Sequence, residues 1–389
     1  MRDVFPRVLL YEGRLGTRCL SEVVADSTLS ALRPADLELP GARRRLLEHA
    51  RARTLRLVLE SEALLPRLRG LGLPGFDEMV SPFQDKCAFR QGMAGAAETI
   101  SPASVTVCRA EIAALDGMRA AYARVGTPAE GRLVIKPVRG SASELVFVCR
   151  DDADWERSRD IILRSPPSSA RVDRERFVLE RYVEGDELAV DVYFSDGAPI
   201  ILGIYEHPFA HDGDVRDTIY RTSASTMRRY RPRLEAALRR WGRHWGIADL
   251  AAHVEVRVRP DGLFPVEVNP LRFGLLTADL SAAAFGINPY TYFFSRRAPD
   301  WDAILSSQAH ELATSLIVGD VPEERVPAGR PLAPDLGRFL GALRGRGLEV
   351  LHGFLLPASE RPYVCAAYVR GPTEAIDAFL SFDFATILR

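Results

Sequence analysis

Two alternating segments joined by a tight turn constrain the fold of this chain more than any other feature. Residues 253–270 read HVEVRVRPDGLFPVEVNP, with polar and apolar residues alternating on both sides of Pro-Asp-Gly. In a strand this alternation puts Glu255 and Arg257 on one face and the intervening valines on the other. A three-residue turn ending in glycine would pair Arg259 with Leu263. The segment therefore predicts an antiparallel hairpin with one charged and one apolar face.

The predicted register brings two carboxylates together on the charged face. It pairs Glu255 with Glu267, and His253 with Asn269. Directly opposed like charges destabilise a sheet, because the side chains lie close together. Two carboxylates and an amide oxygen at this spacing would instead suit a hard cation such as Mg²⁺. The residues alone also allow a simpler interpretation, in which the hairpin presents a solvated polar face.

Lysine is nearly absent from the chain. Lys and Arg total 51, and lysine occurs only at positions 86 and 136, so the other 49 (51 − 2) are arginine. An ammonium is a compact point charge, whereas a guanidinium is a wide planar fork. A narrow phosphate pocket would therefore require lysine at both positions, although chance retention of two lysines explains the same count.

Two further segments have the composition of ligand-binding loops. Lys136 ends an apolar strand and is followed by a small-residue loop, in which Ser141 and Ser143 add hydroxyl donors to backbone N–H groups. Residues 178–194 predict two strands separated by a turn. The end of the first could present backbone groups to an adenine edge, and Glu187 could accept ribose hydroxyls. The alternatives are an ordinary turn and a charged hairpin.

In this order, the motifs resemble the ATP-grasp superfamily of carboxylate–amine ligases, over about residues 80–295. The resemblance implies an α/β (α+β) fold in which two α+β subdomains clamp ATP. A short N-terminal α/β domain and a small C-terminal α+β extension would complete the chain. The implied boundaries are 1–85, 86–180, 181–295 and 296–389.

The resemblance implies three sets of site residues. ATP would be bound by Lys86, Lys136, Ser141, Ser143, Glu180, Arg181, Val183 and Glu187. Mg²⁺, or Mn²⁺ in its place, would be bound by Glu255, Glu267 and Asn269. The implied catalytic groups are Arg257, Arg272 and Lys136. One departure concerns the arginine that in many relatives directly follows Asn-Pro, because here Leu271 intervenes before Arg272.

The implied reaction activates a carboxylate as an acyl phosphate at the expense of ATP and joins it to an amine. The partners would be a small-molecule acid and amine, and the protein could be a homodimer. His207 and His253 are candidate general bases, and the polar segment 207–222, with Tyr220 and Arg221, is a candidate wall of the acceptor site. Two alternatives are an ATP-dependent enzyme that forms a thioester or a phosphorylated product, and a non-catalytic ATP-binding protein.

Charge and cysteine content exclude several other classes. The formal net charge of −1 argues against a broad nucleic-acid footprint. No run approaches the ~20 apolar residues of a membrane-spanning helix, and the N-terminus lacks the apolar core of a signal peptide. The five cysteines form no CxxC pair, which argues against a disulfide framework or zinc site and favours a reducing cytoplasm.

Periodicity predicts the remaining elements. Strands are expected at 4–11, 54–60, 132–136, 145–149, 177–183, 187–194, 199–205, 348–356 and 363–369. Helices are expected at 42–53, 109–124, 154–163, 227–245, near 301–314, at 335–346 and from 373.

Overall fold

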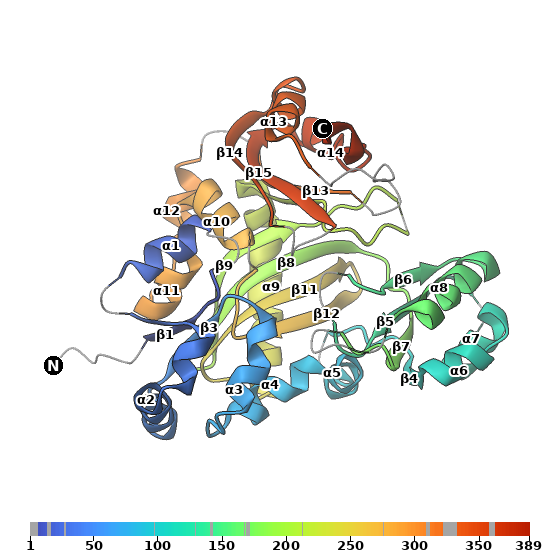
Figure 1. Cartoon of the computed structure of the whole chain (residues 1–389), viewed down its shortest axis with the longest axis horizontal. Coiled ribbons are helices and arrows are strands. Elements are labelled where there is room, and N and C mark those ends of the chain that lie inside the picture. The colour runs from blue at the N-terminus through green and yellow to red at the C-terminus, as the bar shows by residue number, and fades with distance from the viewer. Residues whose placement is uncertain are drawn as a thin grey trace.

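Three β-sheets organise the part of the chain that the structure describes (Figure 1). A three-stranded sheet belongs to the N-terminal unit, a four-stranded sheet to a small lobe, and an eight-stranded sheet forms the centre. The computed structural model describes residues 7–389 except 14–16, 27–28, 97, 129, 141–142, 167, 169–171, 212, 275, 309–311, 322–332 and 358–361.

The N-terminal unit is a small parallel α/β layer, as the sequence predicts. Its strands, in the order β2-β1-β3, are β1 (Arg7–Leu10), β2 (Ser30–Leu32) and β3 (Arg56–Leu59). Its helices are α1 (Arg18–Val24), η1 (Pro34–Glu38), α2 (Pro40–Arg51), η2 (Glu62–Leu64), α3 (Leu65–Arg69) and α4 (Phe76–Gln84). All four residues of β3 are buried, which is typical of a parallel strand covered on both faces.

The small lobe is an antiparallel sheet with helices on one side, and it stands apart from the N-terminal unit in Figure 1. Its strands, in the order β4-β7-β5-β6, are β4 (Ser104–Cys108), β5 (Leu133–Pro137), β6 (Phe147–Cys149) and β7 (Arg176–Arg181). Helix α5 (Lys86–Met93) leads into it, and α6 (Arg109–Ala114), α7 (Gly117–Val125) and α8 (Asp152–Arg164) cover it.

The helix predicted at 109–124 is two helices, α6 and α7. The break falls at Gly117, whose φ of +79° is a conformation that an α-helix cannot continue through. Asp152 stabilises the new helix start by accepting the Met118 N–H at 2.7 Å.

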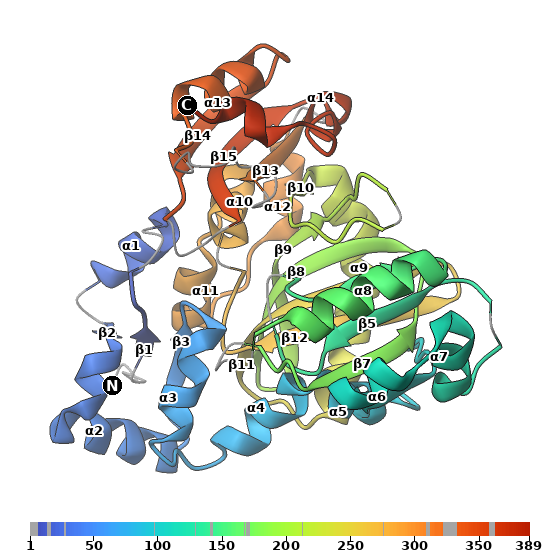
Figure 2. The ribbon, with the colours of Figure 1, turned by 45° about the vertical axis from the view of Figure 1, so that its right-hand side comes forward.

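The central sheet runs from the carboxylate hairpin to the C-terminal region, and Figure 2 shows it beside the small lobe. Its order is β12-β11-β8-β9-β10-β13-β15-β14, and every neighbouring pair is antiparallel. The strands are β8 (Asp186–Ser195), β9 (Ala198–Glu206), β10 (Ile219–Thr222), β11 (Leu250–Arg259), β12 (Gly262–Pro270), β13 (Ala313–Asp320), β14 (Glu349–Leu355) and β15 (Tyr363–Gly371).

Helices cover the central sheet and fill its ends. The longest, α9 (Ala224–His244), packs against β9 along an apolar face that includes Leu234 and Trp241. The others are α10 (Thr277–Phe285), α11 (Pro289–Ser295), α12 (Trp301–Ser306), α13 (Leu336–Arg344), α14 (Thr373–Asp377) and η5 (Phe384–Ile387). None of the helices in the described ranges is both long and apolar enough to cross a bilayer.

One predicted helix is partly wrong. The helix expected near 301–314 ends at Ser306, and Ala313 begins strand β13, in which every residue is buried. A fully buried strand lacks the alternation of a half-exposed one, so its apolar run resembles a buried helix. Through β13, the strands of the C-terminal region continue the central sheet instead of forming a sheet of their own.

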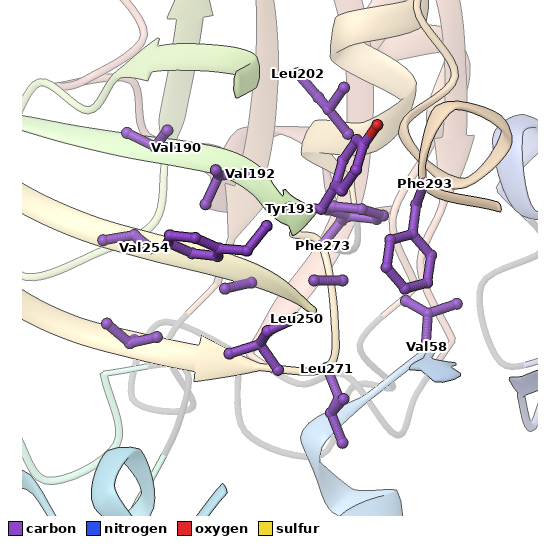
Figure 3. Close-up of a cluster of buried hydrophobic side chains, with 14 of the residues drawn as sticks. Val58, Val190, Val192, Tyr193, Leu202, Leu250, Val254, Leu271, Phe273 and Phe293 are labelled. Carbon is purple, nitrogen blue, oxygen red and sulfur yellow. The ribbon is translucent and has the colours of Figure 1, made fainter. Parts of the chain in front are cut away.

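A shared apolar core joins the central sheet to the N-terminal unit. Figure 3 shows Phe293 next to Val58 of β3, and Leu250 and Leu271 belong to the same cluster. The backbone reinforces this junction, because the Leu59 N–H donates to the carbonyl of Leu271 at 2.7 Å. All five cysteines are free.

Candidate active site

An open pocket of about 920 Å³ is lined by both the small lobe and the central sheet. Most of the expected site residues line it: Lys86, Lys136, Ser143, Glu180, Arg181, Val183, Glu187, Glu255, Arg257 and Glu267. Ser141 lies outside the described residues. Asn269 and Arg272 are not among the residues that line this pocket, but both interact with Glu267.

The hairpin β11–β12 has the predicted register at its carboxylates but not at its turn. Arg259 pairs with Gly262, so the turn holds two residues and the predicted pair of Arg259 with Leu263 is wrong. A bulge beside Glu255 adds one residue to β12 and restores the predicted pair of Glu255 with Glu267. The two carboxylates therefore meet as predicted, by means of a shorter turn and a bulge.

Glu255 and Glu267 differ in their electrostatic surroundings. Glu267 lies 2.6 Å from the Lys86 Nζ and accepts the Asn269 amide N–H at 2.9 Å. Burial alone would raise the pKa of Glu267, but the Lys86 ammonium lowers it to about 2. The one ion-pair partner of Glu255 among the described residues is His253, whose Nε2 is 3.9 Å away. Burial and the charge of Glu267 raise the pKa of Glu255 well above its usual range.

These donors fit a divalent cation. Because the amide N–H of Asn269 donates to Glu267, its oxygen remains available as a ligand. In the described part of the chain, no group of three or more His, Cys, Asp and Glu side chains is arranged as a complete metal site. Two carboxylates and an amide are nevertheless a suitable set for Mg²⁺, which takes its other ligands from water and substrate phosphates.

Lys86 is the first residue of α5, and local contacts hold its side chain at the pocket. Its backbone N–H donates to Val138 at 2.9 Å, and its Nζ donates to the carbonyl of Gly140 at 3.1 Å. Burial would lower the pKa of Lys86, but Glu267 raises it above the ordinary value. Lys86 thus links the start of α5 to the small-residue loop and to the hairpin.

Lys136 belongs to a buried cluster of three charges. Its Nζ lies 2.5 Å from Glu180, and the Arg90 Nε donates to the same carboxylate at 2.9 Å. Burial alone would raise the pKa of Glu180, but Arg90 and Lys136 lower it to about 2. Burial lowers the pKa of Lys136 to about 8, against the attraction of Glu180. Two cations face one carboxylate here, so the excess charge is positive.

Glu187, at the start of β8, is likewise a carboxylate that two neighbouring side chains bind. It accepts the Arg257 Nε at 2.7 Å and lies 3.2 Å from the His207 Nδ1. Burial would raise the pKa of Glu187, but Arg257 and His207 lower it to about 2. An ionised carboxylate has about four lone-pair sites, so Glu187 can still accept hydroxyl groups.

Arg257 lies with the linker residues that precede β8. Its Nη1 donates to the carbonyl of Val183 at 2.7 Å, and its guanidinium lies 4.4 Å from the centre of the Tyr182 ring. Arg257, which was expected to be catalytic, thus contacts Tyr182 and Val183 before β8 and Glu187 at its start. Arg181 lines the pocket with an exposed side chain.

Arg272 differs from Arg257, because its Nε is buried without a hydrogen-bond partner among the described residues. Its charge is close enough to Glu267 to help lower the pKa of that carboxylate. A buried donor without an acceptor costs about 1–3 kcal/mol, so the site favours an incoming anion.

The polar segment 207–222 forms part of the pocket wall. His207 and Asp217 line it, and the Tyr220 ring stacks on His207 at 4.3 Å while its hydroxyl donates to Asp217 at 3.0 Å. Arg221 instead forms ion pairs with two carboxylates outside the pocket. Strand β10, which was not predicted, begins at Ile219.

His253 is anchored by Asp191, its partner on the neighbouring strand β8. Its Nδ1 lies 2.7 Å from Asp191, a carboxylate with no exposed surface. Asp191 also accepts hydrogen bonds from Tyr205, Gly274 and Thr277. These donors fix the imidazole ring, whose other nitrogen faces Glu255.

Three of these residues did not emerge from the sequence. Arg90 could have been found, because it follows Lys86 by four residues and so lies on the same helix face. Asp191 follows Glu187 by four residues on one face of a strand. Asp217 has no such signal, because the irregular backbone before β10 brings it to the pocket.

The fold and the pocket together define a class of protein. Two α+β units line a pocket that contains two lysines and a pair of carboxylates. Residues 130–279 match the family model of the ATP-grasp domain, and the chain has the ATP-grasp fold.

Solved structures agree with this fold along nearly the whole chain. L-amino acid ligase from Bacillus licheniformis is similar with a TM-score of 0.61 and 15% identity, over 96% of both chains. N5-carboxyaminoimidazole ribonucleotide synthetase from Thermotoga maritima gives 0.58 and 14%, over 99% of both chains. Biotin carboxylase from Campylobacter jejuni gives 0.54 and 13%, over 96% of this chain and 89% of that one. No curated protein sequence matches the chain.

Proposed function

We propose that this protein is an ATP-dependent ligase that activates a carboxylate as an acyl phosphate and joins it to an amine. The observation that carries the proposal is the placement of the two lysines of the chain. Lys86 and Lys136 both line the pocket of an ATP-grasp fold, together with the paired carboxylates Glu255 and Glu267, and Lys86 contacts Glu267 directly. This arrangement makes the chance explanation of the lysine count a poor one.

In this proposal the small lobe and the linker bind the nucleotide. Lys86 and Lys136 neutralise phosphate oxygens, and the small-residue loop with Ser141 and Ser143 covers them. Backbone groups of Glu180, Arg181 and Val183 hold the adenine edge. The Glu180 carboxylate is already paired with Arg90 and Lys136, so its side chain orients Lys136 rather than the base.

Glu187 accepts the ribose hydroxyls, and Arg257 holds that carboxylate in place. We therefore assign Arg257 a positioning role, because its hydrogen bonds go to the Glu187 carboxylate and to the carbonyl of Val183. Arg272 has a buried donor without a partner and is the better candidate for an oxyanion. Glu255, Glu267 and Asn269 would hold Mg²⁺, or Mn²⁺ in its place, which supplies positive charge for the phosphates.

Two bond exchanges make up the proposed reaction. An oxygen of the substrate carboxylate bonds to the γ-phosphorus as the bond to ADP breaks. The amine nitrogen then bonds to the acyl carbon, phosphate leaves, and the nitrogen gives up a proton. Such phosphoryl transfer depends mainly on positioning and charge stabilisation. Similarity to an L-amino acid ligase over nearly its whole length favours amino acids or small peptides as both substrates. The homodimer and the cytoplasmic location stay predictions.

The test is a phosphate-release screen of amino-acid pairs with Mg-ATP, with mass spectrometry of the products. We expect release that requires both an acid and an amine, together with a product lighter than their sum by one water. Glu267→Gln serves as the blank. Glu349→Gln is the matched control, because it makes the same change at an exposed carboxylate of β14.

Each other outcome has a distinct meaning. Phosphate release without an amide product would replace the ligase by an enzyme that forms a different bond. ATP binding without turnover on any pair would leave a non-catalytic protein. Equal activity of Glu267→Gln and the wild type would remove the metal assignment.

A further inference from the structure

A second pocket lies between the N-terminal unit and the central sheet. It encloses about 1470 Å³, open to solvent, and shares no lining residue with the nucleotide pocket. Leu250 lines it from β11, and side chains alternate along a strand, so it lies on the opposite face of the hairpin from Glu255. It is therefore separate from the candidate active site.

The wall of this second pocket is mostly apolar. Leu73, Phe76 and Phe83 contribute from the N-terminal unit, and Trp245 and Phe293 from the helices around the sheet. A large apolar hollow in a soluble protein usually marks a ligand or partner site. Other lining residues come from α2, α4 and the segment between α9 and β11.

One buried arginine interrupts the apolar wall. Arg56 of β3 is 5% exposed, and its Nε and Nη2 have no hydrogen-bond partner among the described residues. Its Nη1 reaches Asp249 at 3.3 Å, but Asp249 is also paired with Arg296 at 3.2 Å. Its guanidinium lies 4.2 Å from the centre of the Phe293 ring. Arg56 thus shares its one carboxylate with Arg296, which also reaches Asp196 at 3.6 Å, and two buried donors of Arg56 remain for an acceptor.

We propose that this pocket binds an apolar monocarboxylate, with the carboxylate on Arg56 and the hydrocarbon part against the apolar wall. A guanidinium presents parallel N–H groups that match the two oxygens of a carboxylate. The remaining wall offers few polar groups, which disfavours sugars, nucleotides and polar amino acids. A neutral apolar molecule would fill the volume but leave the Arg56 donors unpaired.

The pocket also contacts the segment that carries the candidate catalytic arginine. Leu271 lines the pocket and lies between Asn269 and Arg272 in the chain. Its φ of +61° is strained for a residue with a branched side chain. Its N–H donates to Ala251 and its carbonyl accepts from Leu59, both at 2.7 Å. A ligand that presses on Leu271 would therefore shift Arg272, and the pocket would regulate the nucleotide site.

The binding test compares octanoate with octanamide, which has the same shape without the charge. By isothermal titration calorimetry, we expect the wild type to bind octanoate at least about tenfold more tightly, as for hydrogen bonds to a charged group. Arg56→Gln should bring the ratio close to one. Arg53→Gln, at the exposed rim of the same pocket, is the matched control and should keep the wild-type ratio.

Two further variants guard against misfolding and against dependence on the ligase proposal. Ala50→Phe fills the pocket from α2 without touching Arg56 and should weaken both probes at least about tenfold. Glu267→Gln should bind octanoate normally, whatever its effect on ATP turnover. Equal binding of the two probes by the wild type, or an unchanged ratio in Arg56→Gln, would overturn the assignment.

The regulatory part has a separate readout. Saturating octanoate should change the affinity for ATP, and saturating ATP should change the affinity for octanoate by the same factor, because coupling is reciprocal. Ala50→Phe should remove the effect. Identical ATP affinities with and without bound octanoate would overturn the coupling through Leu271.

Discussion

Two clusters of buried carboxylates face the same pocket and are balanced in opposite ways. Glu180 is held between Lys136 and Arg90, so that its single charge meets two cations. In the second cluster, Glu255 and Glu267 are paired directly, and Lys86 forms an ion pair with Glu267 but not with Glu255. The first cluster pairs its carboxylate with two cations and keeps an excess of positive charge, whereas in the second, burial and the charge of Glu267 raise the pKa of Glu255.

This difference separates residues that hold the structure from residues that need a ligand. Removing one partner from a buried, satisfied ion pair leaves an uncompensated charge and is costly. Removing one of two opposed carboxylates relieves repulsion, so any loss must appear in cation binding instead. Stability and turnover should therefore respond in opposite ways to the same chemical change in the two clusters.

The largest effect is expected on turnover in Glu255→Gln. Without this carboxylate the cation loses a ligand, and the rate should fall about 10³-fold, equivalent to about 4 kcal/mol. The melting temperature without nucleotide should not fall, because Glu255 has no Lys or Arg partner among the described residues. The phosphate-release assay measures the rate, and scanning calorimetry without nucleotide measures the melting temperature. A variant less stable than the wild type would show that the pair is structural.

Glu180→Gln should show the reverse pattern. Lys136 and Arg90 would stay buried without their carboxylate, at a cost of about 3 kcal/mol in unfolding free energy. Urea denaturation measures the loss. Glu184→Gln is the control, because its carboxylate is close in sequence but exposed. If both variants are equally stable, the Glu180 cluster does not hold the small lobe together.

A smaller effect should distinguish the two arginines. Arg257→Gln weakens the hold on Glu187 and the linker, so we expect the KM for ATP to rise about tenfold with little change in kcat. Arg272→Gln should instead lower kcat, because its unpaired donor suits an anion that forms during the reaction. Steady-state kinetics at saturating acid and amine separates the two. A fall in kcat for Arg257→Gln would restore the catalytic role that the family resemblance implied.

The sequence predicted the pairing of the two carboxylates but not the way it is reached. Alternation fixes which face Glu255 and Glu267 occupy, and a shift of one residue would move one of them to the apolar face. The bulge corrected the error in the turn, so the prediction of contact survived a wrong prediction of turn length. Bulges depend on tertiary fit and leave little trace in a single sequence.

Elsewhere the sequence lacked a usable signal. Strand β13 is buried along its whole length, so its residues do not alternate, and its neighbour β15 begins more than 40 residues later in the chain. The sequence also could not predict the hydrogen bonds of Arg257, because its partners Val183 and Glu187 lie about 70 residues away in the chain. Contacts between distant segments decide both cases, and local periodicity does not encode them.

The last comparison concerns the two lysines themselves. Burial lowers the pKa of Lys136 to about 8, whereas Glu267 raises the pKa of Lys86 above its ordinary value. Phosphate favours the charged form of each lysine, so affinity falls as pH rises through the pKa of the free protein. Lys136 should lose its proton first. ATP affinity should therefore fall about fivefold between pH 8 and 9, where phosphate groups no longer titrate.

Arginine substitutions test which lysine is responsible. Lys136→Arg should bind ATP more weakly because a guanidinium is wider than an ammonium, but its affinity should be flat between pH 8 and 9, since arginine stays charged. Lys86→Arg should also bind more weakly and yet keep the wild-type slope. If the ATP affinity of the wild type does not change between pH 8 and 9, the attraction of Glu180 outweighs the burial of Lys136. Lys136 would then keep its proton through this pH range, despite the second cation, Arg90, beside the same carboxylate.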